Sequence, residues 1–267
     1  MQFKYKAYKN LLAELGRMDY VVELSEIAIK DFLKNLNNAE SPEQFLEEKC
    51  KEHNIWVSLD SSNPSYNQSI LGYISGVYHL FEAFLYEMKE EYKLLTDGES
   101  INFNTETTKL NQIINYFKSK GRFNNVDYIQ FYLIDIFEYY HLLRIYFSHK
   151  KTVSINEIKN KWEKANVHSN EELYAKYRIN NSPKELNEVD FEDYFLFTQI
   201  CKELALRISS LCYPDPDKLA ISLKRFKKYE NESEIIKRLE IYLLNEYAFV
   251  KEDDYDKSFL KSIFTHI

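Results

Sequence analysis

The sequence contains few residues that break helices, since its 267 residues include only five Gly and five Pro. Average usage, about 7% Gly and about 5% Pro, would supply well over twice as many. Proteins built from many short strands need such residues at each turn. Because the chain lacks them and has long segments rich in Leu, Lys and Glu, the sequence predicts an all-α helical bundle.

Cysteine is also scarce, and the motifs of several enzyme classes are missing. Cys50, Cys201 and Cys212 form no CxxC pair and no cluster with His. They therefore predict reduced thiols, with neither a disulfide framework nor a zinc site. No GxxxxGK[ST], GxGxxG, HExxH or GxSxG motif occurs. We therefore expect no metal and no bound cofactor.

Positive charge is not in excess, because the net charge is −7 and the pI is about 5.5. An acidic chain of this kind contacts RNA only through a local basic patch. No stretch of about 18 apolar residues is present to span a bilayer. The opening residues, MQFKYKAYKN, lack the apolar core of a signal peptide. These features predict a cytoplasmic protein that does not enter a membrane.

The sequence does contain a series of long helical segments. In SPEQFLEEKCKEHN, Ser41 is the expected N-cap, Pro42 the first helical residue and Gln44 the partner in a capping box. The polar stretch 150–190 is expected to be a connection with at most short helices. The other predicted elements, in chain order, are two helical patterns in 1–36, a loop at 60–68, helices at 69–95, 105–119, 127–149 and 189–212, a break at 213–217 and two or three helices in 218–267.

The segment 127–149 is the strongest helix prediction. Its apolar residues alternate steps of four and three, the spacing of one buried helix face. These seam residues are Ile129, Leu133, Ile136, Tyr140, Leu143 and Phe147. The segment ends in HLLRIYFSHKK, where the pattern turns from apolar to basic. Arg144 and His149 lie at this boundary and form the candidate site.

Two interpretations of this pair are open. Basic residues near a helix C-terminus can simply complement the negative end of the helix dipole. Alternatively, they form a ligand site, because residues 141–164 hold six positive and two negative charges, an island that suits a phosphate-bearing ligand. His141, Arg144 and Ser148 share one stripe of the helix. His149 lies about 140° from Arg144, so the two converge only if the last turn opens near Ser148 or the arginine arm reaches across.

The pattern Arg144-IYFS-His149 resembles the shortest form of the R-x(4–6)-H motif of the HEPN superfamily, which lies near the end of a long helix. That family packs the motif helix against an earlier one, for which GVYHLFEAFLYEMKEEY (76–92) is the candidate. A later long helix follows in the family, as 189–212 does here. One position departs from the pattern. Many active members have Asn, Asp or His directly after the arginine, where this chain has Ile145.

The resemblance covers about residues 63–212. It implies a HEPN-like helical domain over that range, with an N-terminal helical extension at 1–62 and a C-terminal helical extension at 213–267.

The resemblance further implies metal-independent cleavage of RNA at the interface of a homodimer. The 2′-hydroxyl attacks its own phosphate after a base removes its proton, and a second group protonates the leaving 5′-oxygen. His149 is the expected general acid or base, and Arg144 the expected clamp on the phosphate oxygens. A twofold dimer would place two such pairs in one cleft, with the apolar seam beside Arg144 at the interface. The residues expected to contact RNA are Lys150, Lys151, Ser148 and His141. Family context implies a toxin–antitoxin or antiviral-defence role, with an antitoxin or regulatory protein as a partner.

Two other functions stay open. A catalytically inactive module of the same fold would bind RNA, a nucleotide or a protein partner, and Ile145 favours it. A helical scaffold would use Arg144 and His149 only to cap a helix. Two further residues have two interpretations each. Glu82 either orients Arg144 or forms an ordinary ion pair. Trp162 either stacks on RNA or packs against the protein.

Overall fold

The computed structural model describes residues 3–57, 65–104, 107–121, 131–149, 152–228, 231–249 and 254–267. Within these ranges the regular secondary structure is entirely helical, as the sequence predicts. The elements are α1 (Lys6–Asn38), α2 (Pro42–His53), α3 (Ser65–Leu95), α4 (Lys109–Ser119), α5 (Phe131–Ser148), α6 (Ile155–Asn166), α7 (Glu171–Tyr177), α8 (Phe191–Leu211), α9 (Pro216–Ser222), the 3-10 helix η2 (Lys224–Lys228), α10 (Glu232–Tyr247) and α11 (Asp254–His266).

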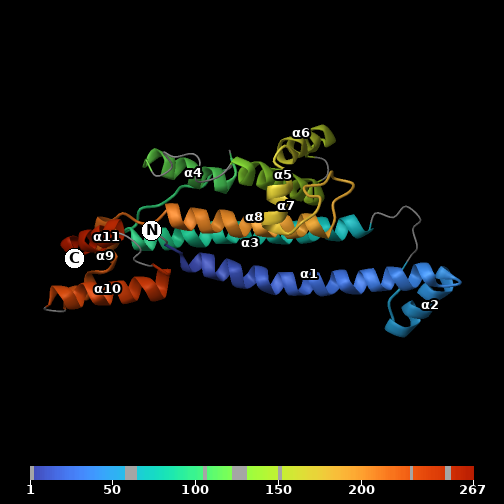
Figure 1. Cartoon of the computed structure of the whole chain (residues 1–267), viewed down its shortest axis with the longest axis horizontal. Coiled ribbons are helices and arrows are strands. Elements are labelled where there is room, and N and C mark those ends of the chain that lie inside the picture. Colours follow the sequence, from blue (N-terminus) through green and yellow to red (C-terminus); the bar gives the residue numbers. More distant parts are fainter. Residues whose placement is uncertain are drawn as a thin grey trace.

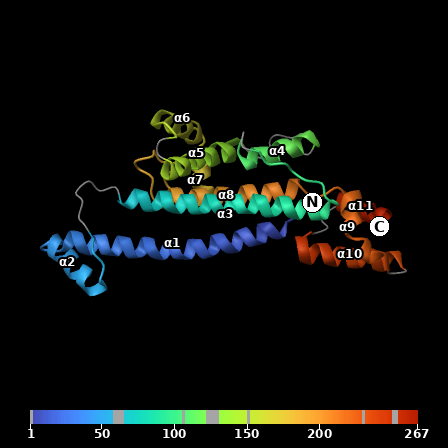
Figure 2. The same cartoon turned by 180° about the vertical axis from the view of Figure 1, so that it is seen from behind.

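The helices form an elongated bundle in layers (Figure 1). α3 and α8 lie side by side in the middle layer. α1 runs along one side of this layer, and α5 packs on the other side with α6 against it, an order that the view from behind repeats (Figure 2). α9, α10 and α11 gather at one end, where both termini lie, and α2 stands at the opposite end.

The first helical segment differs from the prediction, because the two patterns expected in 1–36 form one helix of 33 residues, α1. No proline separates them, and a single interior glycine such as Gly16 costs a helix only about 1 kcal/mol. Leu11, Leu15 and Val22 are buried where α1 packs against α3 and α8. This long buried face stabilises a continuous helix.

The cap predicted for α2 is confirmed in part. The Ser41 hydroxyl accepts a hydrogen bond of 3.3 Å from the backbone N–H of Gln44. The Gln44 side-chain amide donates a hydrogen bond to Glu48 instead of accepting one from the backbone N–H of Ser41, so one half of the expected capping box forms. A complete box occurs at α8, where Asp190 and Asp193 satisfy each other's backbone N–H groups.

Most predicted helix positions are confirmed, with shifts at their ends. α3 begins at Ser65 instead of at residue 69, and 60–64 of the predicted loop lie outside the described residues. In the described part of the polar connection 150–190 the helices are α6, of 12 residues, and α7, of 7 residues. α8 agrees with the helix predicted at 189–212.

One hydrophobic core extends through the described chain, from Phe3 to Ile263, and it crosses the boundaries expected near residues 62 and 212. The Phe3 ring stacks on Tyr247 with centroids 4.8 Å apart. The buried Tyr5 hydroxyl donates a hydrogen bond of 2.5 Å to the backbone carbonyl of Cys212. The first residues of the N-terminal extension are therefore packed against the C-terminal extension and the end of α8 at one end of the central helices.

The sequence also predicts that no helix crosses a membrane and that the cysteines form no disulfide. None of the described helices combines the length and the apolar character needed to cross a bilayer. Cys50, Cys201 and Cys212 are buried, and none forms a disulfide within the described ranges, as the sequence predicts.

Candidate functional site

α5 carries the candidate residues and is held in the bundle by its apolar face. The predicted seam is buried at Leu133, Ile136, Tyr140 and Leu143. Phe137, next to the seam, contacts Phe81 of α3 (ring centroids 5.1 Å apart) and Phe197 of α8 (5.9 Å). Ile129 lies outside the described residues. Because the seam packs inside the chain, any contact with a second copy near Arg144 has to use other residues.

Arg144 lies against Tyr78 of α3. Its guanidinium carbon is 5.1 Å from the centre of the Tyr78 ring, a cation–π contact. The residue is half-buried, and its Nε is buried without a hydrogen-bond partner. No carboxylate in the described part of the chain forms an ion pair with Arg144. Among the described residues Arg144 therefore has no ion-pair partner for its positive charge.

Other partly buried cations differ from Arg144, because carboxylates neutralise them. These ion pairs are Lys109–Glu82, Lys161–Glu138, Lys184–Asp190, Lys202–Asp19 and Arg207–Glu203. Glu82 thus forms the ordinary ion pair that the sequence left open, with 2.5 Å between its Oε1 and Lys109 Nζ. A desolvated donor without an acceptor is unfavourable. Arg144 is therefore the cation in this part of the chain that is best suited to an anion from outside.

His141 shares the Tyr78 ring with Arg144. Its imidazole stacks on that ring with centroids 4.7 Å apart and an interplanar angle of 11°. Burial, reinforced by the positive charge of Arg144, lowers the pKa of His141 to about 4. His141 is therefore neutral at pH 7 and brings no positive charge to RNA. Its contact with RNA stays a prediction.

The last turn of α5 is regular and separates His149 from Arg144. The His149 N–H donates an α-helical hydrogen bond of 2.7 Å to the Ile145 carbonyl, so the helix does not open near Ser148. The Arg144 arm is directed to Tyr78. Ser148 and His149 are exposed at the end of the helix. Within one chain, the structure groups Arg144 with His141 and leaves His149 on another side of α5.

The positive island expected at 141–164 is only partly described. Lys150 and Lys151, the predicted RNA-contacting lysines, lie outside the described residues. The Lys161 ammonium group donates a hydrogen bond to the Glu138 carboxylate and forms an ion pair with it. The Trp162 indole donates a hydrogen bond of 3.0 Å to the carbonyl of Pro183, which favours packing over stacking on RNA.

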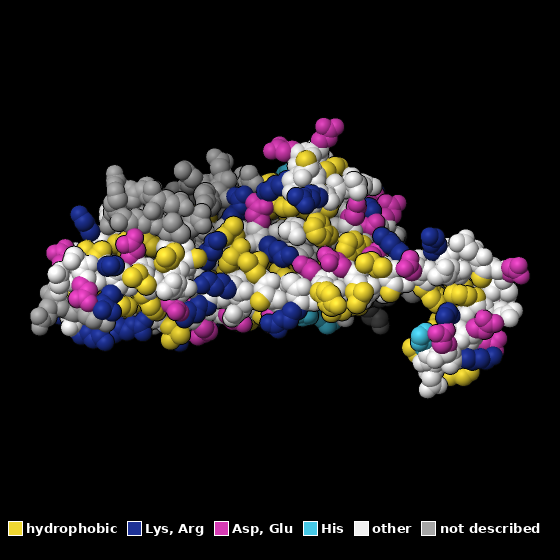
Figure 3. All heavy atoms as spheres, turned by 60° about the horizontal axis from the view of Figure 1, so that its bottom comes forward, with side chains coloured by type: hydrophobic (Ala, Val, Ile, Leu, Met, Phe, Trp, Pro, Cys, Tyr) yellow, Lys and Arg dark blue, Asp and Glu magenta, His cyan; other side chains and the backbone are white. Residues whose placement is uncertain are grey.

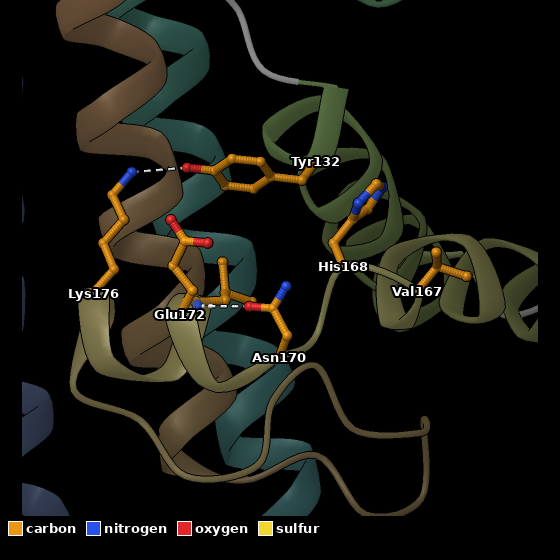
Figure 4. A pocket seen from close by; sticks show the side chains of 7 residues that line it. Tyr132, Val167, His168, Asn170, Glu172 and Lys176 are labelled. Carbon is orange, nitrogen blue, oxygen red and sulfur yellow. Dashed lines mark hydrogen bonds between the residues drawn. The ribbon is translucent and has the colours of Figure 1, made fainter.

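A polar pocket that the sequence does not predict lies at the other end of α5. It has a volume of about 340 Å³, and its lining includes Tyr132, His168 and Lys176. Figure 4 shows Lys176 reaching across to the Tyr132 hydroxyl, at 2.7 Å. His168 Nε2 lies 2.8 Å from a carboxylate oxygen of Asp135. An aspartate that holds an imidazole in this way can fix its orientation and tautomer.

The sequence carries no strong signal for the packing of Arg144 on Tyr78 or for the pairing of Asp135 with His168. Tyr78 lies four residues before Glu82 and so shares a helix face with it, but nothing local indicates that Arg144 packs there. Asp135 and His168 are separated by α6 and come together only in the folded chain.

Comparisons with family models, curated proteins and solved structures gave no match. Among the residues that the structure describes, no group of three or more His, Cys, Asp or Glu side chains is arranged to hold a metal ion.

Proposed function

We propose that this chain is an endoribonuclease of the HEPN type, which cleaves RNA by attack of a 2′-hydroxyl on the adjacent phosphodiester. The observation that carries the proposal is the guanidinium of Arg144, which forms no ion pair with a described residue and has a buried Nε without a hydrogen-bond partner, within the Arg144-x4-His149 pattern at the end of α5. The contacts of α5 with α3 and α8 support the resemblance from which this function comes.

The chemistry assigns one role to the guanidinium and another to the imidazole. Arg144 binds the non-bridging phosphate oxygens through paired hydrogen bonds and stabilises the charge that grows on them. The 2′-oxygen forms a bond to phosphorus as the bond to the 5′-oxygen breaks. One imidazole accepts the 2′ proton, and another protonates the leaving 5′-oxygen. The products are a 2′,3′-cyclic phosphate and a 5′-hydroxyl, and no metal takes part.

The proposed site is composite. His149 points about 140° away from Arg144 on a regular helix, so the two groups of one chain do not face the same phosphate. A twofold dimer would bring His149 of each chain to Arg144 of the other, and it would supply the two imidazoles that acid and base catalysis require. Ser148 precedes His149 in the sequence and would line the cleft, and contact of Lys150 and Lys151 with RNA stays a prediction.

A second function is favoured by one observation, the residue after Arg144. Ile145 is partly buried against the hydrophobic core, where many active HEPN proteins have a polar side chain. A chain without that polar group would still bind an RNA phosphate or a nucleotide at Arg144 without cleaving it.

The test is incubation of the pure protein with mixed RNA in EDTA. Arg144→Ala and His149→Ala should each abolish cleavage while circular dichroism shows an intact helical fold. Arg238→Ala and His53→Ala are matched controls, because both residues are exposed and lie on α10 and α2. End-group analysis should find the cyclic phosphate.

The outcomes separate the two functions. Binding of RNA without cleavage, lost in Arg144→Ala and kept in Arg238→Ala, selects the second function. Neither binding nor cleavage contradicts both.

A further inference from the structure

The exposed side of α1 carries an apolar stripe. Tyr20, Leu24 and Ile27 expose 69%, 54% and 61% of their surface, and Val21 beside them exposes 58%. Figure 3 shows hydrophobic side chains gathered along this side of the molecule. The stripe lies opposite the face of α1 that packs on α3 and α8, and no described element covers it.

The stripe follows the spacing of a coiled-coil seam. Positions that alternate steps of four and three are all exposed, and they are Ala13, Arg17, Tyr20, Leu24, Ile27, Asp31 and Lys34. The apolar residues occupy the centre of this series. Arg17 lies one heptad before Leu24, and Asp31 lies one heptad after it. The apolar middle of the seam is therefore flanked by the positive Arg17 on one side and by the negative Asp31, followed by Lys34, on the other.

We infer that this seam is a dimer interface, in which the α1 helices of two copies pack antiparallel about a twofold axis at Leu24. In that register Leu24 meets the partner's Leu24, Val21 meets the partner's Ile27, and Tyr20 meets the partner's Ala28. Arg17 meets the partner's Asp31, and the same pair recurs at the other end because a twofold interface repeats each contact.

The charges of Arg17 and Asp31 favour a second copy of this chain as the partner and an antiparallel direction for its α1 helix. A parallel pair would set Arg17 against the partner's Arg17 and Asp31 against the partner's Asp31, which is unfavourable at both ends. The antiparallel pair converts both contacts into ion pairs. Asp31 has no ion pair in the described chain, and Arg17 pairs only with Glu14, which is also exposed (N–O 3.0 Å). Because one surface supplies both complementary charges, a second copy of this chain fits it.

This interface is separate from the proposed ribonuclease site. α1 and α5 lie on opposite sides of the α3–α8 layer, so a dimer through α1 leaves both Arg144 side chains on outer faces. The inference does not depend on the proposed activity. The seam is shorter than a standard protein–protein interface, so we expect association that depends on concentration.

The experiment is sedimentation-equilibrium ultracentrifugation of the full chain from about 1 µM to about 100 µM. The wild type should associate through α1 within this range, separately from the pairing at Arg144 that the proposed function requires. Leu24→Glu should raise the dimer dissociation constant at least about tenfold, because it buries two like charges at the twofold axis. Leu244→Glu is the matched control, since Leu244 of α10 is exposed to a similar extent (47%) outside the seam, and it should leave the constant unchanged.

A charge exchange tests the antiparallel register. Arg17→Asp and Asp31→Arg should each weaken the dimer about threefold or more, and the double variant should restore it, because the ion pairs re-form with their signs exchanged. A wild type that stays monomeric at about 100 µM overturns the inference. Equal effects of Leu24→Glu and Leu244→Glu, or a double variant weaker than both single variants, overturn it as well.

Discussion

The imidazole of His141 stacks on the ring of Tyr78, with the centroids 4.7 Å apart, and its burial there makes protonation of His141 unfavourable in the folded chain. Burial and then the charge of Arg144 lower its pKa from 6.5 to about 4, against opposing contributions from Glu82 and Glu138. As the pH falls from 6.5 to 4, His141 therefore becomes protonated in the unfolded chain before it does so in the folded chain. The stability that His141 contributes is therefore present above pH 6.5 and is lost as the pH falls towards 4.

His141→Phe keeps an aromatic ring on Tyr78 and removes the titration. We expect the variant to lose less stability than the wild type between pH 6.5 and pH 4, by up to about 3 kcal/mol for a shift of this size. Urea unfolding at several pH values measures the difference. His53→Phe, a change at an exposed histidine, should follow the wild type, and an identical pH profile for His141→Phe would contradict the prediction.

Asp193 should act in the opposite direction over nearly the same range. Its buried carboxyl accepts hydrogen bonds from the Tyr140 hydroxyl (2.7 Å) and from the backbone N–H groups of Lys184 (2.9 Å) and Asp190 (3.0 Å). Burial outweighs these bonds and raises its pKa from 3.8 to about 6. The stability that protonation of Asp193 contributes is present below pH 3.8 and is lost as the pH rises through about 6.

Asp193→Asn should therefore expose the dependence that His141 alone imposes, so that stability rises more steeply with pH between 4 and 6.5 than in the wild type. The amide cannot accept every one of the three hydrogen bonds, so stability should also fall at each pH by about 1–3 kcal/mol. Urea titrations of the single and double variants with His141→Phe provide the measurement. A slope in Asp193→Asn that is no steeper than in the wild type would show that burial does not raise the pKa of this carboxyl.

Phe137 is the aromatic residue at which the three helices around the site meet. It is 1% exposed and contacts Tyr78, Phe81 and Phe197. Phe137→Ala should reduce the free energy of unfolding by about 3–5 kcal/mol, because it leaves a cavity between α3, α5 and α8. Trp56→Ala is the control, since Trp56 is 84% exposed and its loss should change stability by no more than about 0.5 kcal/mol. Thermal and urea unfolding compare the two variants.

Local sequence patterns predict most of the helices because the forces that form them act over a few residues. The Ser41 hydroxyl caps the helix that begins beside it, and the seam through Leu133, Ile136 and Tyr140 is buried as its spacing predicts. The long helix α1 departs from the expected pair because the burial of its face against α3 and α8 is a tertiary effect. No pattern within residues 1–36 reports that burial.

The arrangement of the site depends on contacts between distant segments, which one sequence does not reveal. Arg144 and His149 can be selected by their spacing, but the position of Tyr78 beside Arg144 follows from the packing of α5 on α3. The pairing of Glu82 with Lys109 is equally non-local. The helical angle between Arg144 and His149 is predictable, and the regular last turn agrees with it.

Arg144 should contribute little to the stability of the isolated chain, although the proposed function depends on it. Arg144→Met removes a cation–π contact worth about 0.5–2 kcal/mol, and it also removes a buried Nε without an acceptor, which costs about 1–3 kcal/mol. We expect an unchanged or higher melting temperature together with loss of RNA binding. Arg207→Met is the matched comparison, because Arg207 bonds Glu203 through its Nε (3.0 Å), and its loss should lower the melting temperature. Calorimetry and RNA filter binding measure both properties, and a lower melting temperature in Arg144→Met with RNA binding intact would assign Arg144 to the fold and not to a ligand.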